Sequence, residues 1–120
     1  MAPGSTWLTF RDSFPDATDT DYPDIRLPAG KILRAVWTSA AGLSQSPVRV
    51  YVSVERIAYG AVRLLQGYVA GDPTWSFGDG LAWHGELPLA APDAPVLNWR
   101  VHNRTGAAAL LTLVVVLTDD

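Results

Sequence analysis

The clearest alternation of hydrophobic and polar residues lies in residues 96–102. The odd positions are apolar and the even positions are polar: Leu97, Trp99 and Val101 alternate with Asn98, Arg100 and His102. A period of two predicts a half-buried strand. The Asn-Arg-Thr-Gly segment at residues 103–106 then predicts a tight turn, because glycine readily adopts the positive φ that such a turn needs.

The segment after this turn has a different pattern. Residues 110–117 read Leu-Leu-Thr-Leu-Val-Val-Val-Leu and are apolar on both faces of an extended chain. A strand of this kind lies between two sheets, or between its own sheet and a neighbouring subunit. We therefore expect a C-terminal hairpin that forms the spine of an all-β domain.

Other strands are predicted by the same pattern. Residues 48–54 are the cleanest amphipathic stretch, with valine at every even position. Further strands are expected at residues 7–10, 31–40, 61–69 and 81–89. Pro88 marks an edge strand or a strand end, because proline cannot donate to a sheet ladder. For the strand expected at residues 61–69, a helix over residues 56–66 is the alternative, although Gly60 and Gly67 make a helix less favourable there.

Seven or eight strands with turns about every ten residues predict an antiparallel β-sandwich or a small barrel. We favour the sandwich, with a jelly-roll-like arrangement. Residues 1–26 are expected to form an N-terminal strand followed by an arm rich in Asp and Pro, and residues 27–120 the sandwich domain. Five of the twelve acidic residues and two prolines fall within residues 12–24, which predicts a loop or an extended arm there.

Charge and composition narrow the function classes. Charged residues make up 18% of the chain, and this low value favours contacts between subunits. The net charge of −3 and the lack of a basic patch argue against nucleic-acid binding. No apolar stretch has the ~20 residues of a membrane span, and the N-terminus lacks the pattern of a signal peptide. Cysteine is absent, which excludes disulfides and thiolate zinc sites.

Two groups of residues are candidate sites. Trp75 and Phe77 lie in a stretch of Gly, Asp, Pro, Thr and Ser, where exposed aromatic rings would stack on sugars or anchor a subunit, with Asp72 and Asp79 as acceptors for hydroxyl groups. Folding of both rings over the end of the sandwich is the alternative. Asp16, Asp19 and Asp21, together with Asp24, are candidates for a Ca²⁺ site, because hard cations bind clustered carboxylates. A solvated acidic loop is the simpler interpretation.

Catalytic chemistry is not predicted. His84 and Glu86, like His102 with Arg100 and Asn98, are expected to form outward polar strips rather than a metal or acid–base site. The sequence has no Gly-x-Ser-x-Gly motif for a serine nucleophile. We expect no cofactor and no enzymatic activity.

Three segments carry a resemblance to a known class of protein. They are residues 27–30 (Leu-Pro-Ala-Gly), residues 83–89 (Trp-His-Gly-Glu-Leu-Pro-Leu) and residues 97–106 before the closing apolar strand. Together they resemble small single jelly-roll proteins of viral and phage particles, of the decoration, minor capsid or fibre-head type, across residues 27–118. The resemblance implies a jelly roll, a homotrimer or other cyclic oligomer, and a structural role without catalysis.

The sequence thus supports two main hypotheses. The first is a virion structural protein that contacts copies of itself and a major capsid or spike protein. The second is a lectin-like carbohydrate-binding module that uses Trp75 and Phe77. The first places the protein in the virion, and the alternatives are a cytoplasmic or an extracellular location.

Overall fold

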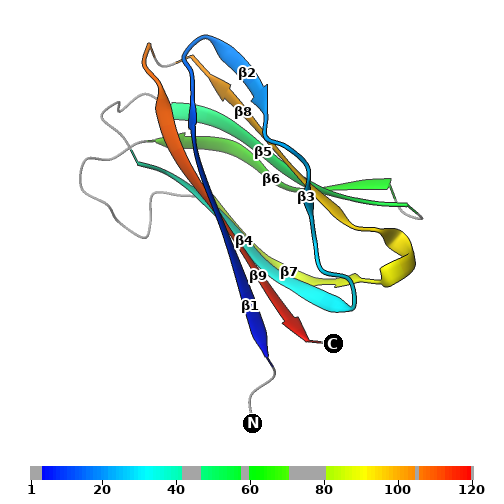
Figure 1. The fold of residues 1–120 in the computed structure, drawn as a ribbon. Helices are drawn as coiled ribbons and strands as arrows, with labels where there is room; N and C mark the ends of the chain where they lie inside the picture. The colour runs from blue at the N-terminus through cyan, green and yellow to red at the C-terminus, as the bar shows by residue number, and fades with distance from the viewer. Residues whose placement is uncertain (1–3, 42–46, 58–59, 71–80, 105, 120) are drawn as a thin grey trace.

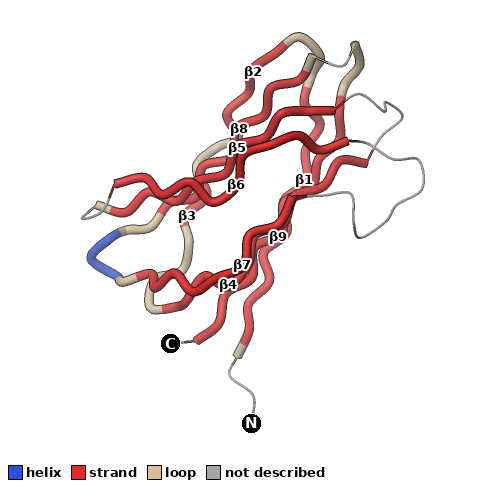
Figure 2. The backbone as a smooth tube through the Cα atoms, turned by 180° about the vertical axis from the view of Figure 1, so that it is seen from behind, coloured by secondary structure: helices blue, strands red, loops and turns tan. Residues whose placement is uncertain are grey.

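A computed structural model of the chain describes residues 4–41, 47–57, 60–70, 81–104 and 106–119. Within these residues it is an antiparallel β-sandwich of two sheets that face each other (Figures 1 and 2). The strands are β1 (Ser5–Phe14), β2 (Thr18–Asp21), β3 (Ile25–Arg26), β4 (Lys31–Ala41), β5 (Pro47–Arg56), β6 (Gly60–Ala70), β7 (Leu81–Leu89), β8 (Val96–Asn103) and β9 (Ala109–Asp119). One turn of 3-10 helix, η1 (Ala91–Asp93), precedes β8. The predicted all-β sandwich is confirmed.

The order of the strands identifies the type of sandwich. Sheet A has the order β1-β9-β4-β7 and sheet B the order β2-β8-β5-β6, with β3 also paired to β8. If β2 and β3 are counted as one interrupted strand, there are eight strands, and every connection except the β5–β6 hairpin crosses between the sheets. This interleaving is the jelly-roll arrangement. The prediction of a jelly-roll-like fold with seven or eight strands is confirmed.

The N-terminal region is more ordered than its composition predicts. β1 continues to Phe14 and pairs with β9 along its whole length, from Ser5 opposite Thr118 to Phe14 opposite Ala109. Within the stretch expected to be a loop or arm, β2 pairs with β8 through Thr18 to Asp21. The division of the chain at residue 26 remains a prediction.

The core lies between the two sheets and consists of the alternating inward residues of both. β5 contributes its even-numbered valines, and β9 contributes its odd-numbered residues from Leu111 to Leu117, all of them buried. Trp99 of β8 is 1% exposed and meets the Phe14 ring edge-on, with 5.1 Å between the ring centroids. Trp83 of β7 is half-buried and packs against this core. The alternative helix over residues 56–66 is wrong, because Arg56 belongs to β5 and residues 60–66 pair with β5 as part of β6.

Local features agree with the turn and edge signals of the sequence. Pro88 lies in β7, an edge strand of sheet A with only β4 beside it, which is the kind of position where proline is tolerated in a sheet. Gly106 has a positive φ of 91° in the segment where a turn was predicted, and Gly30 has a positive φ of 79° just before β4. Within the described residues, no helix has the length and hydrophobicity needed to cross a membrane.

Candidate functional site

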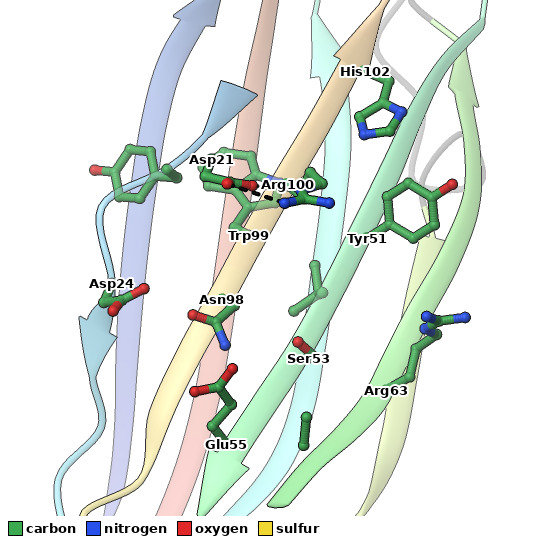
Figure 3. A pocket seen from close by; sticks show the side chains of 13 residues that line it. Asp21, Asp24, Tyr51, Ser53, Glu55, Arg63, Asn98, Trp99, Arg100 and His102 are labelled. Atoms are coloured by element: carbon green, nitrogen blue, oxygen red, sulfur yellow. Dashed lines mark hydrogen bonds and ion pairs between the residues drawn. The ribbon is translucent and has the colours of Figure 1, made fainter. Parts of the chain in front are cut away.

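The outer face of sheet B contains a groove of about 770 Å³ that runs over strands β2, β8, β5 and β6 (Figure 3). Its outward residues follow from strand alternation, since the intervening residues point into the core. Tyr51, Ser53 and Glu55 of β5 alternate with buried valines, and Asn98, Arg100 and His102 of β8 alternate with Leu97, Trp99 and Val101. The sandwich therefore forms this polar surface from residues whose neighbours build the core.

The register of the strands divides the groove into two ends. Tyr51 lies opposite Arg100, and Ser53 lies opposite Asn98. We call the region around Asp21, Tyr51, Arg100 and His102 the paired end of the groove. The open end is formed by five other residues: Asp24, Ser53, Glu55, Arg63 and Asn98.

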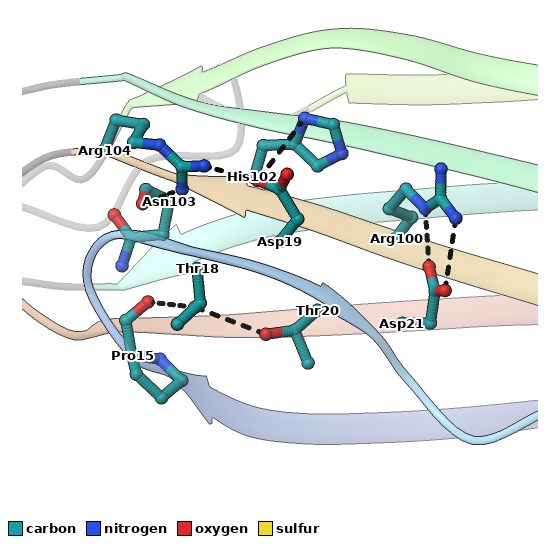
Figure 4. A network of polar contacts seen from close by, with 9 residues as sticks. All are labelled: Pro15, Thr18, Asp19, Thr20, Asp21, Arg100, His102, Asn103 and Arg104. Carbon is teal, nitrogen blue, oxygen red and sulfur yellow. Dashed lines mark hydrogen bonds and ion pairs between the residues drawn. The ribbon is translucent and has the colours of Figure 1, made fainter.

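The paired end is held by an ion pair across β2 and β8 (Figures 3 and 4). Nε of Arg100 donates to Oδ1 of Asp21 at 2.5 Å, and Nη2 donates to Oδ2 at 3.2 Å. This bidentate contact lowers the pKa of the Asp21 carboxyl and raises the pKa of Arg100, in both cases chiefly through the side-chain hydrogen bond. Both groups are thus charged over the ordinary pH range and neutralise each other.

Beside this ion pair, two arginines flank a tyrosine. The guanidinium carbon of Arg49 lies 4.9 Å from the centroid of the Tyr51 ring, and that of Arg63 lies 5.8 Å from it. The His102 ring is 5.2 Å from Tyr51. These cation–π contacts help to hold the Tyr51 ring in place. Tyr51 thus belongs to a cluster of cationic and aromatic side chains at the paired end.

The open end differs from the paired end because most of its polar side chains lack a hydrogen-bond or ion-pair partner. Among the described residues, the side chains of Asp24, Ser53, Glu55 and Asn98 have no hydrogen-bond or ion-pair partner. Nη1 of Arg63 donates to Gln66, and its remaining N–H groups have no carboxylate partner in the described part of the chain. Side chains in this state are available to bind a ligand or water.

A second polar network borders the groove where β2 meets β8 (Figure 4). Oδ1 of Asp19 lies 2.9 Å from Nη2 of Arg104 and 3.8 Å from Nδ1 of His102. The buried Asn103 amide donates to the carbonyl oxygens of Phe14 and Ala107, at 2.9 Å in each case. These contacts fix the polar strand β2 against β8.

The three aspartates proposed for Ca²⁺ have separate protein partners. Asp16 accepts a hydrogen bond from the Gly106 amide, Asp19 faces Arg104, and Asp21 binds Arg100. No cluster of three or more metal-ligating side chains occurs among the described residues. These contacts do not test whether the ion binds, so the calcium site remains a prediction.

The other predicted sites fall in different places. Asp72, Trp75, Phe77 and Asp79 lie outside the described residues, so the lectin-like site remains a prediction as well. The strip of Asn98, Arg100 and His102 faces the groove. His84 and Glu86 are exposed on the outer face of sheet A, as expected, and Oε1 of Glu86 accepts a hydrogen bond from Arg34 at 2.6 Å.

Four groove residues were missed as site residues: Tyr51, Ser53, Glu55 and Arg63. Asp24 was considered only with the acidic stretch. The alternation in residues 48–54 marks Ser53 and Glu55 as outward-facing, but it does not show which other strands lie beside them. Arg63 lies at the groove because β6 pairs with β5. Asp24 lies there because the chain passes along the groove between β2 and β3. The missing information was therefore the order of the strands.

Sheet A has an apolar outer face of its own. Val114 and Val116 of β9 are half-buried, but they point away from the core that Leu113 and Val115 fill. Val116 pairs with Trp7 of β1, which is 66% exposed, and Val114 pairs with Trp37 of β4. We call these four residues the apolar face of sheet A. Within one chain, β9 is thus fully buried on one side only.

Comparisons with known proteins agree with the fold. No family profile and no curated protein sequence gives a match. A chain of the cyanophage Pam1 capsid asymmetric unit matches with a TM-score of 0.60 at 17% identity, over 100% of this chain and 92% of that chain. The VP2 subviral particle of infectious bursal disease virus matches with a TM-score of 0.46 at 10% identity, over 98% of this chain and 32% of that chain. This chain therefore spans about a third of the VP2 chain.

The likeness to viral jelly-roll proteins that the sequence indicates is confirmed as a likeness of fold. It covers the whole chain in the phage structure, and that structure is named for a capsid. At 17% identity it shows the fold alone.

Proposed function

We propose that this chain is a structural component of a virus or phage particle, as a capsid, minor capsid, decoration or spike protein, and that it acts without catalysis. The observation that carries the proposal is the jelly-roll strand order, matched over the full chain by a chain of similar length in a phage capsid asymmetric unit. A fold alone does not determine function. The proposal therefore also needs a surface suited to assembly.

The apolar face of sheet A is such a surface. Trp7, Trp37, Val114 and Val116 form neighbouring positions on three adjacent strands. At one end, a polar group made by Arg34, Glu86 and Thr118 borders this face. An apolar centre with a polar rim is the usual anatomy of a protein interface, in which tryptophan is enriched.

We propose that copies of the chain associate through this face as a trimer or other cyclic oligomer, and that the assembly contacts a major capsid or spike protein. The mechanism is burial of neutral surface, which requires no reacting group. Mass spectrometry of particles purified from the host that carries the gene would test the location. Absence of the chain from such particles would contradict a virion role.

Assembly is tested by light scattering coupled to size exclusion at micromolar concentration. We expect an oligomer, and we expect Val114→Asp to dissociate it, because the substitution places a charge in the apolar face of sheet A. Ser53→Asp is the matched control, since it adds the same charge to a central strand of the opposite sheet. A monomeric wild-type protein, or equal effects of both substitutions, would refute assembly through this face.

A further inference from the structure

We infer that the open end of the groove on sheet B is a binding site for a neutral oligosaccharide. This site shares no residue with the aromatic pair at positions 75 and 77, and the inference does not depend on a role in a virus particle. It depends on the shape, charge balance and hydrogen-bonding capacity of five described side chains.

The shape of the groove suits a small, extended ligand. The whole groove, with the paired end included, has a volume of about 770 Å³, and typical small-molecule sites have ~300–1,000 Å³. Ser53 and Asn98 are direct cross-strand neighbours, and both are half-buried. Because these side chains are short, they form a polar floor, and the longer Glu55 and Arg63 lie on either side of Ser53 (Figure 3). A site built on paired strands is rigid, so little ordering is needed when a ligand binds.

The open end carries charges of both signs. Glu55 and Asp24 are carboxylates without a cationic partner, and Arg63 is a guanidinium without a carboxylate partner, among the residues that the structure describes. An anionic ligand would meet Glu55 and Asp24, and a cationic ligand would meet Arg63. At the paired end, Asp21 neutralises Arg100. Two carboxylates against one guanidinium leave the open end with one excess negative charge, which disfavours an anionic ligand, and Arg63 disfavours a cation beside it. A neutral ligand can use all three groups as hydrogen-bond partners.

The hydrogen-bonding groups are complementary to hydroxyl groups. Carboxylates of Glu55 and Asp24 only accept hydrogen bonds, Arg63 only donates, and Asn98 and Ser53 do both. A sugar hydroxyl donates one hydrogen bond and accepts others, so adjacent hydroxyls on one ring can use acceptors and donors together. A neutral peptide would instead pair its backbone with the edge of a sheet. This groove lies on the face of the sheet, which favours the carbohydrate.

The test uses the full-length protein and a panel of immobilised oligosaccharides that includes neutral, sialylated and sulfated members. We expect binding to one or more neutral members. Asn98→Ala and Glu55→Gln should each weaken this binding by about tenfold, because each removes hydrogen bonds to the ligand. Glu86→Gln is the matched control on the outer face of sheet A and should leave the affinity unchanged, with light scattering confirming the same assembly state for each protein.

A second measurement does not depend on variants. The best neutral oligosaccharide is titrated into isotopically labelled wild-type protein, and amide shifts are followed by NMR. Shifts concentrated on β5, β6 and β8 would support the site. The inference is overturned if no panel member binds, if only acidic sugars bind and Arg63→Ala abolishes their binding, or if shifts fall outside these strands. Binding of a peptide library in place of sugars would also overturn it.

Discussion

Trp99 is the side chain on which the core depends most. Its ring is 1% exposed and lies 5.1 Å from both the Phe14 and the Tyr22 ring centroids, so it joins β8 to the N-terminal segment. Trp99→Ala should reduce the free energy of unfolding by about 3–5 kcal/mol, through lost burial and the cavity left behind. Denaturant unfolding monitored by circular dichroism would measure this loss. Tyr68→Ala, at a 62% exposed position, is the control and should cost far less.

Asp21 gives a prediction about pH. Its pKa is lowered in the folded protein by the hydrogen bond from Arg100, so the folded state binds a proton less readily than the unfolded state, whose pKa is near 3.8. The stabilisation is therefore complete above about pH 5 and is lost as the pH falls through the lowered pKa. We expect Asp21→Asn to be slightly less stable than wild type at neutral pH, with the difference closing below about pH 4. A difference that grows in acid would contradict this assignment.

At the residue scale, the sequence could predict burial but not neighbours. Alternation alone places Leu97, Trp99 and Val101 in the core and Asn98 outside it, and the structure confirms all four. It cannot show that Asn98 faces Ser53, because their proximity depends on the register of β8 against β5. A site made across strands is therefore hidden until the strand order is known.

β9 shows how an element can have two apolar faces with different roles. Leu113 is fully buried between the sheets, whereas Val114 lies half-buried on the outer side of sheet A. Leu113→Ala should lower the free energy of unfolding by about 2–5 kcal/mol. Val114→Thr should change the stability of the single chain little, since threonine keeps the branched shape and the hydroxyl group can reach water. Denaturation at a concentration that gives monomers would separate the two effects.

β2 shows why one strand was not predicted. Its sequence, Thr-Asp-Thr-Asp, has no large apolar residue, so hydrophobic periodicity indicates only a loop. The strand forms because β8 provides the bonding edge and because Arg100 and His102 stand opposite Asp21 and Asp19. Tertiary pairing, not local propensity, determines this element.

For the whole molecule, the pairing of β1 with β9 joins the two ends of the chain (Figure 1). Strand number and turn spacing predict a sandwich, but they do not specify which of several antiparallel orders the strands adopt. The interleaved order has few contacts between consecutive strands, and such non-local pairing is not encoded in any short segment. This explains why the sequence predicts the class of fold better than it predicts the groove on sheet B.

The same topology predicts that the sandwich cannot fold without its N-terminal segment. Deletion of residues 1–26 removes Phe14 and Ile25 from the core and leaves β9 without a partner along one edge. Losing one buried Phe costs about 3–5 kcal/mol, and a domain has only about 5–15 kcal/mol in total. We expect residues 27–120 to show no cooperative thermal transition by circular dichroism, whereas a truncation that begins at Ser5 should melt like the full chain. A cooperative transition of the shorter fragment near the wild-type temperature would show instead that residues 1–26 are a separable arm, because the remaining strands would then hold the core without β1.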